Sequence, residues 1–423
     1  MNRLHDISFT ISYCLLAICV ITLPFDTFLI LPATLLLFLN WLIDCIIHKK
    51  SALYFQKQQL FYLVPFVAFY LLYIIAIFYS DNKYEAVKEL EYKWSFIVFP
   101  LLFSTFSAEK MNLKKLNKLL LYFVLAMGAV AITNFILSTL SYQKTAIFYD
   151  YFYTNLSHFM HPSYQSLYAC TAFIIAFYAL LFKFREQSIS FNILLILLLP
   201  IFVAYIIMLQ SKSGIMFLLL AFLFLGIYRI NYHKNRFGFT ILFLLILGGS
   251  AVFMIKQDKF PVNRMTVFLK EFQNREDEGK YNGSLIRLKI WKVAIKTGIE
   301  VLPFGTGTGD VQQRLNEAYQ QEGLEEGVAR QYNAHNQFIQ TFVALGIPGL
   351  LLLLSLLAVP LVVALRSQNM VLFLFTFGIF IFLFSESMFE RYAGSNFILL
   401  MMGILINSCR NSSRMDELKT TEE

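Results

Sequence analysis

The sequence predicts an all-α polytopic integral membrane protein with about 12 transmembrane helices and one large external helical loop between spans 9 and 10. Three observations support this fold class. The 423 residues are 58% hydrophobic and only 15% charged, too little polar surface for a soluble protein of this length. Apolar stretches of about 20 residues, the length that crosses the hydrocarbon, recur along the chain. Lys and Arg are distributed unevenly between the segments that join these stretches.

Twelve apolar stretches are candidate membrane spans. They lie near residues 7–25, 27–47, 60–79, 94–106, 117–140, 163–182, 191–209, 213–230, 238–255, 337–364, 370–386 and 392–408. No small-residue cleavage site separates the first span from polar sequence, so we predict an uncleaved anchor rather than a removed signal.

The orientation of the spans follows from their flanking charges. With the N-terminus in the cytoplasm, the inner segments hold 17 Lys and Arg residues and the short outer loops hold six. Positive charge accumulates on the cytoplasmic side of membrane proteins. We therefore predict an even number of spans with both termini cytoplasmic. The net charge of +8 is explained by this topology, so no nucleic-acid partner is expected.

Residues 256–336 form the one large extramembrane segment, which the charge rule places outside. A connection this long is expected to be folded and functional. Its sequence predicts an amphipathic helix, then the turn-rich stretch PFGTGTGD, then a polar helix capped by Asp310. The apolar positions of the amphipathic helix are Leu285, Leu288, Trp291, Ile295 and Ile299.

The chain thus divides into four parts. They are spans 1–9 (residues 1–255), the external loop (256–336), spans 10–12 (337–408) and a cytoplasmic tail (409–423).

Several classes of site are absent from the sequence. All five cysteines lie in or beside apolar spans and none forms a CxxC pair, which argues against a disulfide framework or a zinc site. No GxxxxGK[ST] loop for ATP occurs. Ionisable residues are almost absent from the middle of the spans, where a transporter would hold its substrate and coupling ion. The polar residues gather at the outer face instead, which favours chemistry on something presented at that surface.

Three outer-face features have plausible structural explanations as well as functional ones. Lys212, at the tip of the turn LQSKSG (209–214), could be a cation for a substrate or a snorkelling interfacial lysine. Arg287, four residues before Trp291, could likewise be a cation for a substrate, or it could anchor the helix at a lipid headgroup. His161, before Pro162, is best explained as part of a helix-entry turn.

A fourth feature combines a histidine with glycines at fixed spacing. His335 and Asn336 precede an apolar stretch in which Gly346 and Gly349 flank Pro348. A helix that only spans a membrane needs none of these residues. The glycines would allow a neighbouring backbone or a lipid tail to approach closely, although helix packing alone also explains them.

These residues resemble a known family, the O-antigen ligase and polymerase-like membrane glycosyltransferases. Its signature is His followed by Asn, Ser or Gln, then nine residues and Gly-x-x-Gly, which His335, Asn336, Gly346 and Gly349 match. The upstream stretch RLKIWKVAIKTGIEVLPFGTGTGD is similar to the Arg-x-x-x-Trp segment that leads to Pro-x-Gly-x-Gly in that family. The chain departs at Lys212, where the family has arginine; lysine keeps the charge but loses the two-pronged geometry.

The resemblance implies transfer of a glycan from an undecaprenyl-diphosphate carrier to a sugar hydroxyl, at the periplasmic face of the bacterial inner membrane. His335 would be the general base, since its ordinary pKa of about 6.5 suits that role, and Arg287 would stabilise the pyrophosphate leaving group. Lys212, Asn336, Gly346 and Gly349 would contact substrate. The scheme requires no cofactor or metal.

The acceptor is open at this point. An O-antigen ligase acting on lipid A-core is favoured, with an O-antigen or exopolysaccharide polymerase as the alternative. A protein O-glycosyltransferase is disfavoured because no additional domain follows the last span, and a polysaccharide-lipid flippase because charge is scarce within the spans. Membrane lipids are the other expected partner.

Overall fold

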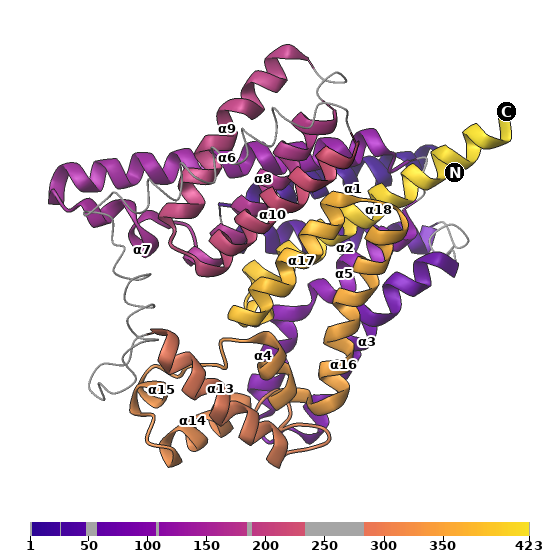
Figure 1. Cartoon of the computed structure of the whole chain (residues 1–423). Helices are drawn as coiled ribbons and strands as arrows, with labels where there is room; N and C mark the ends of the chain where they lie inside the picture. Colours follow the sequence, from indigo (N-terminus) through magenta and orange to yellow (C-terminus); the bar gives the residue numbers. More distant parts are fainter. Residues whose placement is uncertain are drawn as a thin grey trace.

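A computed structural model of the chain describes residues 2–25, 27–47, 57–106, 110–183, 188–232 and 283–422. Every regular element in these ranges is a helix (Figure 1). The first half contains α1 (Asn2–Thr22), α2 (Thr27–Ile47), α3 (Lys57–Tyr79), α4 (Lys83–Lys93), α5 (Ser95–Thr105), α6 (Leu113–Thr145), η1 (Phe148–Tyr151), α7 (Tyr153–Leu156), α8 (Pro162–Phe182), α9 (Ile189–Met208) and α10 (Lys212–Tyr232). The second contains α13 (Gly283–Glu300), α14 (Val311–Gln321), α15 (Glu325–Ala329), α16 (Gln337–Arg366), α17 (Met370–Ser385), η3 (Met388–Glu390) and α18 (Tyr392–Glu422).

Helices occupy eleven of the twelve stretches predicted to span the membrane. The ninth, 238–255, lies outside the described residues, as do residues 256–282 of the predicted external loop. Among the described helices, seven are long and apolar enough to cross a membrane, and three shorter apolar segments lie in α1, α10 and α17. The all-helical, membrane-type fold is therefore confirmed, whereas the number of twelve spans stays a prediction.

Helix α18 lies at the centre of the bundle. Its apolar part, Tyr392–Cys409, is 89% buried, whereas only 22% of the corresponding part of α2, Ile30–Ile47, is buried. Figure 1 shows α13, α14 and α15 gathered with α4 at one end of the molecule, and both chain ends at the opposite end. The two ends of the chain thus lie away from the segment that was predicted to be external.

Helix α4 lies in a segment that the charge count treated as one of the short outer loops. Asn82 caps its first turn by accepting from the Glu85 backbone N–H at 3.1 Å. Lys83 donates to three carbonyl oxygens at the end of α3, between 2.6 and 2.8 Å. A polar helix with a cap at its start therefore packs directly after the apolar α3, and its lysines take part in specific contacts.

Helix α13 is apolar on two faces. The residues that pack inward are Ile286, Ile290, Val293, Ala294 and Thr297. The face predicted from the sequence is largely exposed instead, with Leu288 at 55%, Ile295 at 43% and Ile299 at 57% of their full accessible surface. An exposed apolar stripe on a helix is what a membrane surface would cover.

Helix α14 begins where the sequence predicts, but its predicted cap is wrong. Asp310 makes no side-chain hydrogen bond to the first turn of α14. Its carboxylate accepts instead from the backbone N–H groups of Asp81 and Asn82, each at 2.8 Å. These two charge-assisted bonds tie the start of α4 to the start of α14.

Helix α16 is broken at Gly346, and the Pro-x-Gly-x-Gly loop (residues 303–307) forms hydrogen bonds with the backbone groups that the break leaves unpaired. Gly346 has φ 63° and ψ −150°, and Pro348 has no N–H to offer the carbonyl of Ala344. The Gly307 N–H donates to that carbonyl at 3.0 Å, and the Thr306 N–H donates to Val343 O at 2.8 Å. In return, the Ile347 N–H donates to Pro303 O at 3.0 Å. The two glycine motifs therefore form one structural unit.

A Gly346→Ala substitution is expected to destabilise the protein by about 1–3 kcal/mol, because its backbone conformation is nearly restricted to glycine. A Cβ at this position would also lie 2.0 Å from Pro303 O. Thermal unfolding of the purified protein in detergent measures the loss. Gly323→Ala is the matched control, since Gly323 has φ 68° but open space around it. An equal loss for both variants would show that the contact with the Pro303 loop contributes nothing.

Candidate functional site

His335 lies in a short bend just before α16. Its φ is 46°, and its backbone N–H donates to the side-chain oxygen of Asn333 at 2.9 Å. The imidazole packs edge-on against Tyr332, with ring centres 5.2 Å apart, and its side chain is 22% exposed. The bend therefore fixes the ring while leaving part of it accessible.

Glu386 brings together the two residues that were predicted to be catalytic. His335 Nδ1 lies 2.8 Å from Glu386 Oε1, and Arg287 Nη2 donates to Glu386 Oε2 at 3.2 Å. Glu386 follows the last residue of α17 and is 9% exposed. One carboxylate thus joins the end of α17, the N-terminal part of α13 and the bend before α16.

The charges at this bridge set the proton positions. Burial alone would raise the pKa of Glu386, but the hydrogen bond from His335 and the charges of His335 and Arg287 outweigh it and lower that pKa. The carboxylate is therefore ionised at neutral pH and accepts a hydrogen bond from Nδ1. In the neutral form of the imidazole, this bond places the proton on Nδ1 and leaves the lone pair on Nε2, the tautomer that can accept a proton there.

Arg287 is held by two of its five N–H groups. Besides the bond to Glu386, Nη1 donates to the carbonyl oxygen of Ser385 at 3.0 Å. The side chain is 36% exposed, so the remaining donors are partly accessible. The guanidinium can bind an anion without leaving Glu386.

The turn around Lys212, at the start of α10, contacts Ser385, the residue next to Glu386. Ser213 Oγ lies 2.5 Å from Ser385 Oγ, on the residue whose carbonyl Arg287 binds. Lys212 itself is exposed at the start of α10. Its predicted role with substrate stays a prediction.

The remaining predicted site residues have clear structural contacts. Asn336, 2% exposed, caps α16 by accepting from the N–H groups of Phe338 and Ile339 at 2.9 and 3.1 Å. Gly346 accommodates the backbone of Pro303, one of the two explanations considered for it. Gly349 packs against Leu345 and Thr341 of its own helix. The contacts of Asn336, Gly346 and Gly349 with substrate stay predictions.

A cavity of about 1650 Å³ opens at His335. His335, Arg287, Glu386, His161 and Arg391 line one part of it. Its other walls come from α4, α14 and the residues after α15. A volume of this size exceeds that of a typical small-molecule pocket and suits a large, extended ligand.

Two further cationic or titratable side chains lie in this cavity. His161 caps α8, as the predicted helix-entry turn implies, and burial lowers its pKa. Arg391 is exposed, and its guanidinium has no ion pair with any residue in the described ranges. Arg391 therefore adds an accessible positive charge to the cavity, and Arg287 and Arg391 both act to lower the pKa of His161.

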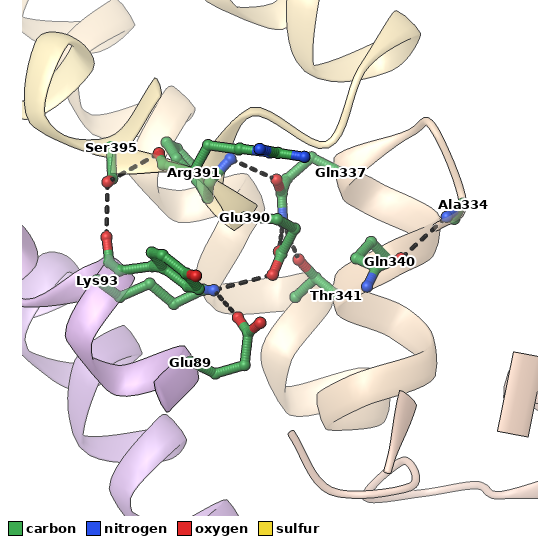
Figure 2. A network of polar contacts seen from close by, with 11 residues as sticks. Glu89, Lys93, Ala334, Gln337, Gln340, Thr341, Glu390, Arg391 and Ser395 are labelled. Atoms are coloured by element: carbon green, nitrogen blue, oxygen red, sulfur yellow. Dashed lines mark hydrogen bonds and ion pairs between the residues drawn. The ribbon is translucent and has the colours of Figure 1, made fainter. Parts of the chain in front are cut away.

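A buried ion-pair network fixes the junction of α4, η3 and α16 (Figure 2). Lys93 is 0% exposed and contacts Glu390 at 2.9 Å and Glu89 at 2.5 Å. Gln337 donates to Glu390 at 2.8 Å and accepts from the Phe389 N–H at 2.7 Å. Because Gln337 is the first residue of α16, this network holds the helix that carries the His335 bend.

The protonation states of Glu89, Glu390 and Lys93 give this network no net charge. Burial raises the pKa of Glu89 to about 8, so it is largely protonated at pH 7. Burial would also raise the pKa of Glu390, but the Lys93 ammonium outweighs this effect and lowers it. Lys93 and Glu390 then form one ion pair, with Glu89 as an uncharged neighbour.

A Lys93→Met substitution is expected to destabilise the fold by roughly 3–5 kcal/mol, because the carboxylate of Glu390 would remain buried without its partner. Thermal unfolding in detergent measures this loss. The double variant Lys93→Met/Glu390→Gln should recover part of it, since it removes the uncompensated charge. If the double variant is no more stable than Lys93→Met, the ion pair is not the source of the stability.

The sequence alone did not identify Glu386 or the Lys93 network as parts of the site. Glu386, from the His335 bridge, and Glu390, from the Lys93 network, lie four residues apart between the apolar helices α17 and α18. Carboxylates at such a place are costly to bury unless they are paired. The position of two carboxylates between apolar helices was the one signal that the sequence offered, but their partners Arg287 and Lys93 are distant in sequence.

Among the described residues no group of His, Cys, Asp or Glu is arranged to hold a metal ion.

Comparisons with known proteins bear on the part of the chain that carries these residues. No curated protein matches the chain significantly. Residues 193–354 match the family model described as O-Antigen ligase, a range that includes Lys212, Arg287, His335 and both glycines of the α16 motif. This part of the chain is thus similar to the O-antigen ligase family.

Proposed function

We propose that the protein transfers a glycan from an undecaprenyl-diphosphate carrier to a sugar hydroxyl, as an O-antigen ligase whose acceptor is lipid A-core. The observation that carries this proposal is the contact of His335, Glu386 and Arg287 at one end of a large cavity. A base and a cation held together by one carboxylate suit a reaction that removes a proton and releases an anion.

In the proposed reaction the acceptor hydroxyl gives its proton to His335 Nε2 as its oxygen attacks the anomeric carbon of the donor. The bond from that carbon to the phosphate oxygen breaks, and its electron pair leaves with the undecaprenyl diphosphate. The ionised Glu386 stabilises the imidazolium that forms. The free N–H groups of Arg287, with Lys212 as a second cation, take up the charge that develops on the leaving phosphate.

We infer that this reaction takes place on the periplasmic side of the bacterial inner membrane, with both chain termini in the cytoplasm. The excess of Lys and Arg in the predicted inner segments supports this orientation. The external part then comprises residues 256–336, between membrane parts 1–255 and 337–408 and a tail at 409–423.

The proposal is tested with purified protein, a lipid-linked glycan donor and two acceptors. Transfer to lipid A-core supports the ligase, and joining of two lipid-linked glycans instead identifies the polymerase. No product with either acceptor would contradict the proposal.

Transfer is expected to continue in EDTA and without ATP, because the proposed chemistry uses only side chains and the energy of the lipid-linked phosphoester. The same assay measures product with and without chelator. Loss of product in EDTA that Mg²⁺ or Mn²⁺ restores would show that a metal takes part.

A further inference from the structure

We propose that the part of the cavity between α4 and α14 is a binding subsite for an uncharged glycan chain. The proposal rests on the function proposed above and assigns a place to the sugars that extend from the reacting centre. The catalytic residues occupy one end of the cavity, and the helices that lie away from the membrane bundle form the other (Figure 1).

Helix α14 presents a continuous polar face to this cavity. Its lining residues are Gln312, Gln313, Asn316, Glu317 and Gln320. The opposite face carries the fully buried Leu315 and Tyr319, whereas Val311, which is 5% exposed at the helix start, also lines the cavity. The helix is thus anchored by its apolar side and offers a row of carboxamides to the cavity.

Helix α4 forms the facing wall with residues one helical turn apart. Glu85, Lys88, Glu89 and Tyr92 line the cavity and are all half-buried. Asp310 fixes the distance between the two walls, because it binds the backbone at the start of α4 and directly precedes α14. The cleft is therefore a built feature rather than a gap between independent loops.

The side chains of the cleft match sugar hydroxyls. Each carboxamide offers both donors and an acceptor, and each carboxylate accepts from hydroxyls. Gln312 donates to Asn316 at 3.0 Å and Gln313 to Glu317 at 2.9 Å, so the polar groups are already oriented along the helix. Tyr92, Tyr332 and Tyr392 add flat apolar surfaces among them.

The charges divide the cavity into two parts. In the α4–α14 part, Lys88 and Arg330 are the two lining cations within the described residues, and each is paired, with Glu85 and Glu326 respectively, at 3.2 Å. Glu317 adds a further carboxylate. Arg287, which shares Glu386 with His335, provides accessible positive charge beside the imidazole. Phosphate is therefore favoured beside His335, whereas acidic sugars are disfavoured in the α4–α14 part.

The test uses soluble neutral oligosaccharides of hexoses and N-acetylhexosamines, and counterparts that contain uronic acids. Binding to the purified full-length protein is measured by equilibrium dialysis. The double variant Gln313→Ala/Gln320→Ala should bind the neutral probes about tenfold more weakly, through loss of side-chain hydrogen bonds. Gln321→Ala is the matched control, because Gln321 is an exposed glutamine of the same helix that does not line the cavity. It should bind like the unaltered protein.

Binding and transfer fail separately in this design. The His335→Ala variant should still bind neutral oligosaccharides while losing transfer. If the unaltered protein binds them but transfers no glycan, the proposed function is contradicted and the subsite is not. Unchanged binding by the double variant, tighter binding of the uronic-acid probes, or no binding of any neutral probe would overturn the subsite. In the transfer assay, a raised KM for the donor assigns the subsite to the donor glycan, and a raised KM for the acceptor assigns it to the acceptor glycan. Two unchanged KM values would also overturn it.

Discussion

The His335→Ala variant is expected to lose glycan transfer by about 10²–10⁴-fold, the usual contribution of a general base. Nε2 is the acceptor that Glu386 leaves free, and alanine provides no group to take the hydroxyl proton. The bend itself should survive, because its hydrogen bond to Asn333 uses the backbone N–H. The variant should therefore enter the membrane at normal abundance.

The measurement is the rate of transfer by purified protein at saturating donor and acceptor. His158→Ala is the matched control, since His158 is exposed and does not line the cavity. It should retain full activity. Near-normal turnover by His335→Ala would show that another group, or water alone, removes the proton.

The membrane helices were largely predictable from the sequence because their signal is local. A run of about 20 apolar residues specifies a helix in a bilayer without reference to the rest of the chain. Helix α4 was missed because its mixed polar sequence resembles a loop unless the contacts of Lys93 and of its cap at Asn82 are known. The same holds for α13, whose buried face could not be chosen from two apolar stripes.

Individual candidate residues could be chosen from the sequence, but their arrangement could not. His335 and Arg287 stood out through their motifs, yet the residue that joins them is Glu386, which lies 51 residues from one and 99 from the other. Gly346 and the Pro303 loop likewise meet only after α16 bends. Such contacts depend on how the helices pack, and a sequence pattern with helical period carries no information about the partner helix.

The Arg287→Lys variant is expected to reduce transfer by about 10²-fold although the charge is kept. Removing one donor that stabilises developing negative charge has an effect of this size. Arginine holds Ser385 O and Glu386 with two N–H groups and keeps three for the phosphate, whereas an ammonium has three donors in all and no fork. Lysine at this position must give up either the contact that orients Glu386 or its contacts with the leaving group.

Lys212 is expected to respond in the opposite way. Lys212→Arg should be tolerated, because the resemblance places arginine at this turn, and Lys212→Ala should weaken use of the donor without unfolding the protein. Transfer is measured at several donor concentrations for all three variants, which separates kcat from KM. A damaged Arg287→Lys with an active Lys212→Arg fits a phosphate held by the Arg287 fork and assisted by a point charge at residue 212. If Arg287→Lys is fully active and Lys212→Arg is inactive, the geometry that matters lies at Lys212, and Arg287 serves only to position Glu386.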